Sequence, residues 1–189
     1  MRRPSRRRSR QPGLPRPLVA LALATAIGVV GAGIVHVASV LAVPSFAPRT
    51  GFDIAGELGA DGRFVPLEQD DPYLRAVVCR FGTDMPARVL ALGDVPHWSA
   101  SVVTPEGVIV YSLNDRVALD GALDLVVLRT SDVARWRPIL SNDVELVPVP
   151  GDRAMVVLRS FVADPTWEAA ARRFLDAAVC EPLEDGPEG

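Results

Sequence analysis

Few residues in this chain could carry out nucleophilic or acid–base chemistry. The sequence has two histidines, and only His97 lies outside a long apolar stretch near the N-terminus. A Ser-His-Asp site would need this histidine beside a serine such as Ser99 or Ser112 and beside the carboxylate of Asp115. Sequence spacing alone does not bring these groups together. A half-exposed histidine at the start of a strand is the simpler interpretation of His97.

No set of metal or cofactor ligands is evident in the sequence. A zinc site needs three or four clustered Cys, His or carboxylate ligands, and no such spacing occurs here. The phosphate-binding patterns GxxxxGKS/T and GxGxxG do not occur either. We therefore expect no metal and no cofactor, and the sequence leaves open whether the chain is an enzyme.

A dense polar group in the predicted β domain consists of Asn114, Asp115 and Arg116, followed closely by Asp120. These residues form our candidate recognition loop, which could line a binding site at one end of a sheet. A purely structural role would explain them equally well. In that case the Asn and Asp side chains hold a turn, while Arg116 pairs with Asp120.

The two cysteines, Cys79 and Cys180, both follow the apolar stretch. In a reducing cytosol they would be buried thiols, whereas outside the cytoplasm an even pair favours a disulfide. Closing a loop of about 100 residues stabilises a fold by about 4 kcal/mol in the chain-entropy model. We expect Cys180 at the end of a C-terminal helix, which the bond would fasten to the first strand of the domain.

Residues 18–43 are 26 consecutive residues without a formal charge. A helix that spans a bilayer needs about 20 apolar residues, so this stretch is long enough to cross once. Seven arginines precede it and the first acidic residue is Asp53. Because arginine clusters stay on the cytoplasmic side, we expect the N-terminus inside and the rest of the chain outside.

A cleaved signal peptide is the alternative to a retained anchor. The small residues around Val40 and Ala42 would permit cleavage after Ala42. The apolar core of a signal peptide, however, usually has about 7–15 residues, so the length of this stretch favours a retained transmembrane helix.

The charge is distributed unevenly along the chain. The formal net charge of −3 includes seven arginines before the apolar stretch, which leaves 13 basic and 23 acidic residues after Val43. A domain with this acidic excess should repel nucleic acid. We therefore expect no nucleic-acid partner, and the lipid bilayer itself as the first partner.

The chain divides into five predicted segments. Residues 1–17 form a disordered, Arg-rich cytoplasmic tail, and residues 18–43 form the transmembrane helix. Residues 44–73 are a linker with a short helix near its middle, because they hold several Pro and Gly and only scattered apolar side chains. Residues 74–181 form an extracytoplasmic β domain, and residues 182–189 form an acidic, disordered tail.

Period-two alternation predicts strands in this domain, starting near residues 75–81 and 88–92. Thr104-Pro105-Glu106-Gly107 suits a tight turn and predicts a hairpin between residues 97–103 and 108–113. Residues 150–152 predict a second hairpin between residues 144–149 and 154–162. Short helices are expected after Ser131 and after Asp164. The pattern predicts a mainly β fold with flanking helices (α+β), arranged as an antiparallel, jelly-roll-like sandwich after one transmembrane helix.

Five short phrases occur in an order that resembles a known bacterial family. They are residues 96–99 (PHWS), 111–116 (YSLNDR), 120–123 (DGAL), 147–151 (VPVPG) and 157–159 (VLR). Their spacing across residues 75–165 resembles the domain of unknown function numbered 1254 (DUF1254) and its companion numbered 1214 (DUF1214). The resemblance implies a jelly-roll-like β domain and small members with one membrane helix, but no established activity. His97 stands where the family usually has an aromatic residue, and the long N-terminal half of the larger relatives is missing.

These observations predict a single-pass protein of the bacterial inner (cytoplasmic) membrane with a periplasmic or extracellular β domain. We expect that domain to be a binding or assembly module of the cell envelope. A larger relative of the same family or another envelope protein would be its partner, since a function that needs both halves of the larger relatives requires a second chain. The alternative is an envelope hydrolase that acts on a carbohydrate or an ester.

Overall fold

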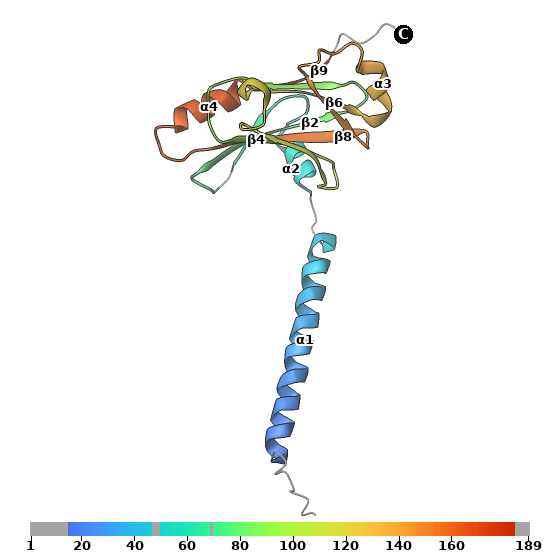
Figure 1. Ribbon diagram of the computed structural model, residues 1–189, viewed down its shortest axis with the longest axis vertical. Coiled ribbons are helices and arrows are strands. Elements are labelled where there is room, and N and C mark those ends of the chain that lie inside the picture. Colours follow the sequence, from blue (N-terminus) through green and yellow to red (C-terminus); the bar gives the residue numbers. More distant parts are fainter. Residues whose placement is uncertain (1–14, 47–49, 69, 184–189) are drawn as a thin grey trace, which may run out of the picture. The chain divides into compact units, whose positions relative to one another are not determined.

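The computed structural model describes residues 15–46, 50–68 and 70–183 (Figure 1). Its contacts divide the chain into one unit up to Pro48 and a second unit from Arg49 onward. Most of the predicted N-terminal tail lies outside the described residues, as does the C-terminal tail beyond Leu183.

The first unit contains a single helix, α1 (Arg16–Phe46), which includes the predicted span at residues 18–43. Its 31 residues correspond to about 46 Å at 1.5 Å per residue. The apolar window of this helix has no buried residues. A helix that is apolar on all sides and covered by nothing suits a lipid surrounding. Its length and composition fit a membrane anchor, and a signal sequence would pass the same test.

The second unit is built from two β-sheets (Figure 1). Sheet I has the strand order β1-β2-β8-β4-β5, and sheet II has the order β7-β6-β3-β9. The strands of sheet I are β1 (Val65–Leu67), β2 (Leu74–Gly82), β8 (Arg153–Phe161), β4 (Trp98–Val103) and β5 (Ile109–Asn114). Those of sheet II are β7 (Glu145–Val149), β6 (Leu123–Arg129), β3 (Ala87–Ala91) and β9 (Val179–Pro182). The helices are α2 (Gly51–Glu57), α3 (Val133–Trp136) and α4 (Glu168–Asp176), with 3₁₀ turns η1 (Leu119–Gly121) and η2 (Thr130–Asp132).

One apolar core joins the two sheets. Val77, Cys79 and Phe81 alternate along β2 and belong to this core, as the period-two pattern predicts. The core also takes side chains from both sheets and from α4. The ring centroid of Phe174 in α4 lies 5.9 Å from that of Trp98. The predicted mainly β fold with flanking helices is confirmed, whereas a jelly-roll connectivity is not.

The predicted β4–β5 hairpin is confirmed, but the second hairpin is wrong. β7 belongs to sheet II and β8 to sheet I, so residues 150–152 carry the chain from one sheet to the other. This connection is held by Thr83, whose hydroxyl donates to the Gly151 carbonyl and whose N–H donates to the Asp152 carbonyl. A turn-forming tripeptide fits such a crossing as well as it fits a hairpin.

The antiparallel pairing of the sandwich has one exception. β6 and β7 run parallel, with Val127 opposite Val147. The segment that contains η2 and α3 forms the crossover between them, and Trp136 packs from α3 onto Val126 and Leu128 of β6. Parallel neighbours need such a crossover connection.

The predicted linker at residues 44–73 is wrong in part. α1 continues to Phe46, a short helix (α2) follows in the linker as expected, and β1 pairs with β2. A capping box between Thr50 and Asp53 starts α2. Phe52 and Ala55 then cover an apolar cluster on the outer face of sheet I. That face has to be covered because β2 and β8 carry apolar side chains on both sides.

The end of the domain also differs from the prediction. The last helix ends at Asp176 instead of continuing to Cys180. The chain then forms β9, which pairs with β3 and places Cys180 opposite Val89. The Leu183 N–H donates to the Pro86 carbonyl at 2.7 Å, so the predicted tail at residues 182–189 begins too early.

Candidate functional site

Asn114 builds the turn that follows β5. Its side-chain Oδ1 accepts the backbone N–H of Arg116 at 3.0 Å. Its backbone carbonyl accepts the N–H groups of Val117 and Ala118 at 3.2 and 3.0 Å. An asparagine that bonds to the backbone two residues later is a standard turn device, so Asn114 has a structural role.

Asp115 forms hydrogen bonds with the backbone at the start of β4. Its carboxylate Oδ2 accepts the backbone N–H of His97 at 3.0 Å, and its own N–H donates to the Trp98 carbonyl at 3.2 Å. His97 lies just before β4 with a φ of 62°, a backbone conformation that non-glycine residues rarely adopt. The carboxylate therefore stabilises an unfavourable turn between β4 and the preceding segment.

Arg116 and Asp120 have no such structural partner. Both side chains are exposed, and no ion pair joins them in the described part of the chain. The alternative in which Arg116 pairs with Asp120 therefore does not account for them. Asp120 sits in η1 with a φ of 51° and lines a groove.

The groove beside Asp120 is about 310 Å³ in volume. It lies where the edge strand β5 meets the edge of sheet II, because its lining comes from β5, η1, β6, β7 and the segment before β7. The lining residues are Tyr111, Leu113, Val117, Leu119, Asp120, Ala122, Asp124, Asn142, Asp143 and Glu145. The lining therefore combines five apolar or aromatic residues with four carboxylates and one amide, and no basic residue lines it.

The electrostatics of the groove follow from these groups. Arg88 forms an ion pair with Asp124 at 3.0 Å, and this hydrogen-bonded contact raises the pKa of Arg88. Burial, and secondarily the carboxylate of Glu145, raises the pKa of the Tyr111 phenol. Three of the lining carboxylates form no ion pairs among the described residues, namely Asp120, Asp143 and Glu145. They leave the groove negatively charged.

The groups of the hypothetical Ser-His-Asp site do not come together. The Ser112 hydroxyl contacts the Ala100 carbonyl and the Ser101 hydroxyl. The His97 ring is exposed and lies edge-on to Phe161, with centroids 6.4 Å apart. Asp115 bonds to the backbone of His97 rather than to its ring. Within the described ranges, no group of three or more His, Cys, Asp or Glu side chains could hold a metal ion.

Cys79 and Cys180 form a disulfide with their Cα atoms 6.5 Å apart. The pairing agrees with the sequence expectation, but the elements it joins do not. Cys79 lies in β2 of sheet I and Cys180 in β9 of sheet II, so the bond links the two sheets of the sandwich rather than a helix and a strand.

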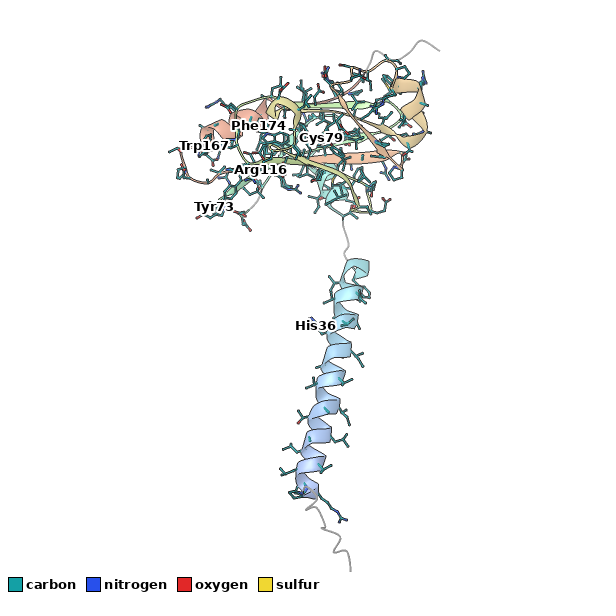
Figure 2. All side chains as sticks on the ribbon, in the orientation of Figure 1. His36, Tyr73, Cys79, Arg116, Trp167 and Phe174 are labelled. Carbon is teal, nitrogen blue, oxygen red and sulfur yellow. A yellow bond between two sulfur atoms is a disulfide. The ribbon has the colours of Figure 1, made fainter. Side chains whose placement is uncertain are left out.

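The sequence analysis overlooked an aromatic group at one end of the domain. Tyr73 and Phe161 have ring centroids 6.4 Å apart, and both rings are largely exposed. Trp167 is the other exposed aromatic residue of the described domain, and Figure 2 places it at the same end as Tyr73. Period-two analysis could not find this group because its members lie at the ends of elements that are far apart in sequence.

No protein-family model matches the chain, and no curated protein matches it. Among solved structures, the VPA0106 protein of Vibrio parahaemolyticus is similar to this chain, with a TM-score of 0.55 and 12% identity over 72% of this chain. An uncharacterised protein of Burkholderia cenocepacia is 14% identical over 73% of this chain, with a TM-score of 0.45. The chain spans only 36% and 39% of the lengths of these two proteins. At these identities the similarity to the Vibrio protein concerns the fold alone.

Proposed function

We propose that this chain is a single-pass protein of the bacterial inner membrane whose β domain lies in the periplasm or outside the cell. The observation that carries the proposal is a disulfide-linked β domain after an apolar helix. α1 has the length of a membrane span. The seven arginines before it favour an N-terminus in the cytoplasm, which would put the domain on the opposite side.

The disulfide supports the same location. Structural disulfides persist in oxidising compartments and are rare in the cytosol. Cys79 and Cys180 are both buried, and the bond between them links the two sheets. A domain held together in this way is suited to the space outside the cytoplasmic membrane.

We further propose that the β domain is a binding or assembly module. Asn114 and Asp115 serve the turn, whereas the side chains of Arg116 and Asp120 are exposed, and Asp120 lines the groove. A groove that combines apolar side chains with a few polar groups is typical of a recognition surface. The partner we expect is an envelope protein, such as a larger relative in the DUF1254 and DUF1214 families that the chain resembles.

No contact among the described residues specifically favours the alternative of a carbohydrate or ester hydrolase. A general base must reach the nucleophile it activates. Ser112 instead bonds to Ala100 and Ser101, and Asp115 bonds to the backbone of His97. The binding module is therefore the function that the geometry supports best.

Location is tested with reporters fused after Gly189 in a bacterial host. We expect an alkaline phosphatase fusion to be active, because this enzyme folds only outside the cytoplasm. A cytoplasmic fluorescent reporter at the same position should stay dark. Fluorescence from that reporter, with an inactive phosphatase, would contradict the proposed orientation.

Binding is tested by crosslinking the full-length chain in intact membranes. We expect one envelope protein to be recovered repeatedly, and its crosslinks to map to the β domain. A variant with the reversed charges Arg116→Glu and Asp120→Arg should recover less of it. Recovery of the chain without any partner would contradict the module proposal.

A further inference from the structure

The four edge strands of the two sheets differ in how they are protected against pairing with another strand. Natural sheets protect their edges with short strands, prolines and charges. β1 has three residues including Pro66, β7 carries Glu145 and Pro148, and β9 has four residues including Glu181 and Pro182. β5 has six residues, Ile-Val-Tyr-Ser-Leu-Asn, without a charge or a proline.

Its only protective feature is a bulge at one end. The β4–β5 register is regular from Asn114 to Tyr111 and shifts before Ile109. A bulge disrupts pairing locally, so the regular part of β5 next to the candidate recognition loop is left open.

Backbone groups of this open part point away from the sheet. The Asp115 N–H donates to the Trp98 carbonyl of β4. In an antiparallel pair, alternate residues bond to the same neighbour, so Leu113 and Tyr111 also face β4. The backbone N–H and carbonyl of Ser112 and the N–H of Asn114 must then face outward, where no described strand pairs with them. These are the groups that an added strand would use.

Exposed apolar side chains flank this edge. Ile109 is 62% exposed, and Val117 and Leu119 in the following loop are 69% and 66% exposed. Tyr111 and Leu113 line the groove beside β5. A strand added to β5 would therefore cover apolar surface in addition to satisfying the backbone.

The charge of the groove determines the chemistry of such a strand. Side chains of an added strand alternate between the two faces of sheet I, so every second residue would point toward the groove. There it would meet Asp120, Asp143 and Glu145, with no basic residue in the lining. Arg or Lys at alternate positions of the added strand would complement the charge of these carboxylates.

We propose that the edge of β5 accepts an extended segment of another envelope protein by strand addition, with basic side chains directed into the acidic groove. This mode of recognition uses backbone hydrogen bonds for affinity and side-chain pockets for specificity. The inference rests on the proposed function and names the partner chemistry of the same groove.

A second copy of this chain fits the edge less well. Two β5 strands paired about a two-fold axis would bring identical surfaces together. Each copy would then present Asp143 and Glu145 beside a strand that carries no basic residue. Like charges on facing surfaces oppose such a pairing.

The test uses the full-length chain in detergent micelles and a fluorescein-labelled octapeptide of alternating Arg and Val. Fluorescence anisotropy measures binding at about 0.15 M salt, where weak surface attraction is screened. The controls are an alternating Glu-Val octapeptide and a block peptide with four Arg followed by four Val. We expect the alternating Arg-Val peptide to bind and both controls to bind at least about tenfold more weakly.

Two variants test the groove. Asp143→Lys with Glu145→Lys should weaken binding of the Arg-Val peptide about tenfold or more. The matched control, Asp94→Lys with Asp176→Lys, makes the same charge change at exposed positions outside the groove lining. It should leave the affinity unchanged. Equal weakening in both variants would show a non-specific charge effect and overturn the proposal.

Hydrogen exchange tests the edge. The backbone N–H of Ser112 should exchange more slowly when the Arg-Val peptide is bound. Ser112→Pro, which removes this N–H, should abolish binding. It removes no backbone hydrogen bond to β4, although the hydroxyl contacts with Ala100 and Ser101 are lost. The exchange measurement on the unaltered chain decides the question if that variant does not fold. Unchanged exchange at Ser112 with the peptide bound would overturn strand addition.

Two further outcomes separate this inference from the proposed function. If envelope crosslinking recovers a partner whose contacts lie away from β5, and the peptide does not bind, the inference fails and the binding module stands. If crosslinks between identical copies map to β5, the occupant is a second copy and the inference is also overturned.

Discussion

Asp115 and Arg116 are neighbours in the candidate recognition loop, and the structure separates their roles. The Asp115 carboxylate accepts the His97 N–H, whereas the Arg116 side chain is exposed and forms no ion pair among the described residues. At the scale of single residues, the loop therefore combines one group that stabilises the fold with one that is available to a partner.

Substitutions at these two positions should have opposite consequences. Asp115→Ala removes one hydrogen bond and should lower the free energy of unfolding by about 1 kcal/mol. Arg116→Ala should change it by less than about 0.5 kcal/mol, as surface substitutions usually do. Urea unfolding of the two variants measures both values. A larger loss for Arg116→Ala than for Asp115→Ala would contradict the separation of roles.

The disulfide makes a second prediction at the residue scale. Cys79→Ser with Cys180→Ser should lower the free energy of unfolding by about 2–5 kcal/mol, because the bond closes a loop of about 100 residues. Urea unfolding with and without reductant measures this effect. In the unaltered chain isolated without reductant, neither cysteine should react with an alkylating agent. Quantitative labelling of both cysteines under those conditions would show that the bond is not formed.

At the scale of elements, α2 is the helix that the sequence predicts within the linker, but it packs on the domain. Phe52 is 3% exposed and Ile54, on the same helix, is 42% exposed. The Phe52 ring also has the Arg80 and Arg153 guanidinium groups at 5.1 and 5.3 Å from its centroid. The helix therefore belongs to the domain and presents one face to sheet I.

Alanine substitutions in α2 test this assignment. Phe52→Ala should lower the free energy of unfolding by about 3 kcal/mol, as expected for removal of a buried aromatic side chain. Ile54→Ala is the matched control on the exposed face and should cost less than about 1 kcal/mol. Thermal and urea unfolding compare the two variants. Equal small effects would mean that residues 51–57 behave as the linker that the sequence predicts.

α4 is tied to sheet I by a carboxylate. Glu168 accepts hydrogen bonds from Arg172 at 2.6 Å and from Arg75 of β2 at 3.0 Å. Both hydrogen bonds lower the pKa of Glu168, and the one from Arg172 has the larger effect. A lowered pKa stabilises the fold above the unfolded-state pKa of about 4.3, and this contribution is lost as the pH falls through the folded-state pKa.

The lowered pKa of Glu168 predicts how the stability of a Glu168→Gln variant depends on pH. Its Tm should lie below that of the unaltered chain at pH 7, and the difference should shrink as the pH falls below about 4. Asp176→Asn, at the other end of α4, is the control and should show a smaller difference at pH 7, because Asp176 forms no ion pair among the described residues. A difference for Glu168→Gln that grows toward low pH would contradict the assignment.

At the scale of the whole molecule, α1 is the helix whose length and composition fit a membrane anchor or a signal sequence. The helix runs without interruption from Arg16 to Phe46 and so continues past Ala42, the position after which a signal peptidase could cut. A retained anchor and a removed signal sequence predict different mature proteins.

We expect the full-length chain of 20.2 kDa to remain with the membrane after carbonate washing. The mass and the N-terminal sequence of the protein from washed membranes check this. A variant with Leu23→Arg and Ile27→Arg should be lost from the membrane, since charges near the centre of a span are costly. A mature protein that begins at Val43 would show that the signal-peptide alternative is correct.

The sequence by itself determined the features that depend on short stretches of chain. The apolar run at residues 18–43 predicts a long apolar helix, because its 26 uncharged residues are enough to cross a bilayer core, and α1 contains this run. The turn at residues 104–107 specifies the β4–β5 hairpin, in which Gly107 has a φ of 85°. The cysteine pair could also be proposed, since the chain has only two cysteines.

Only the tertiary structure decided which distant segments meet. The sequence predicts two strands at residues 144–149 and 154–162, but it does not reveal that they belong to different sheets. Residues 179–182 are too short for a clear pattern, and they become a strand because β3 is available to pair with them. The groove likewise forms from β5, β6 and β7. Local periodicity reports which side of an element is apolar, whereas sheet membership and open edges depend on pairing between residues far apart in sequence.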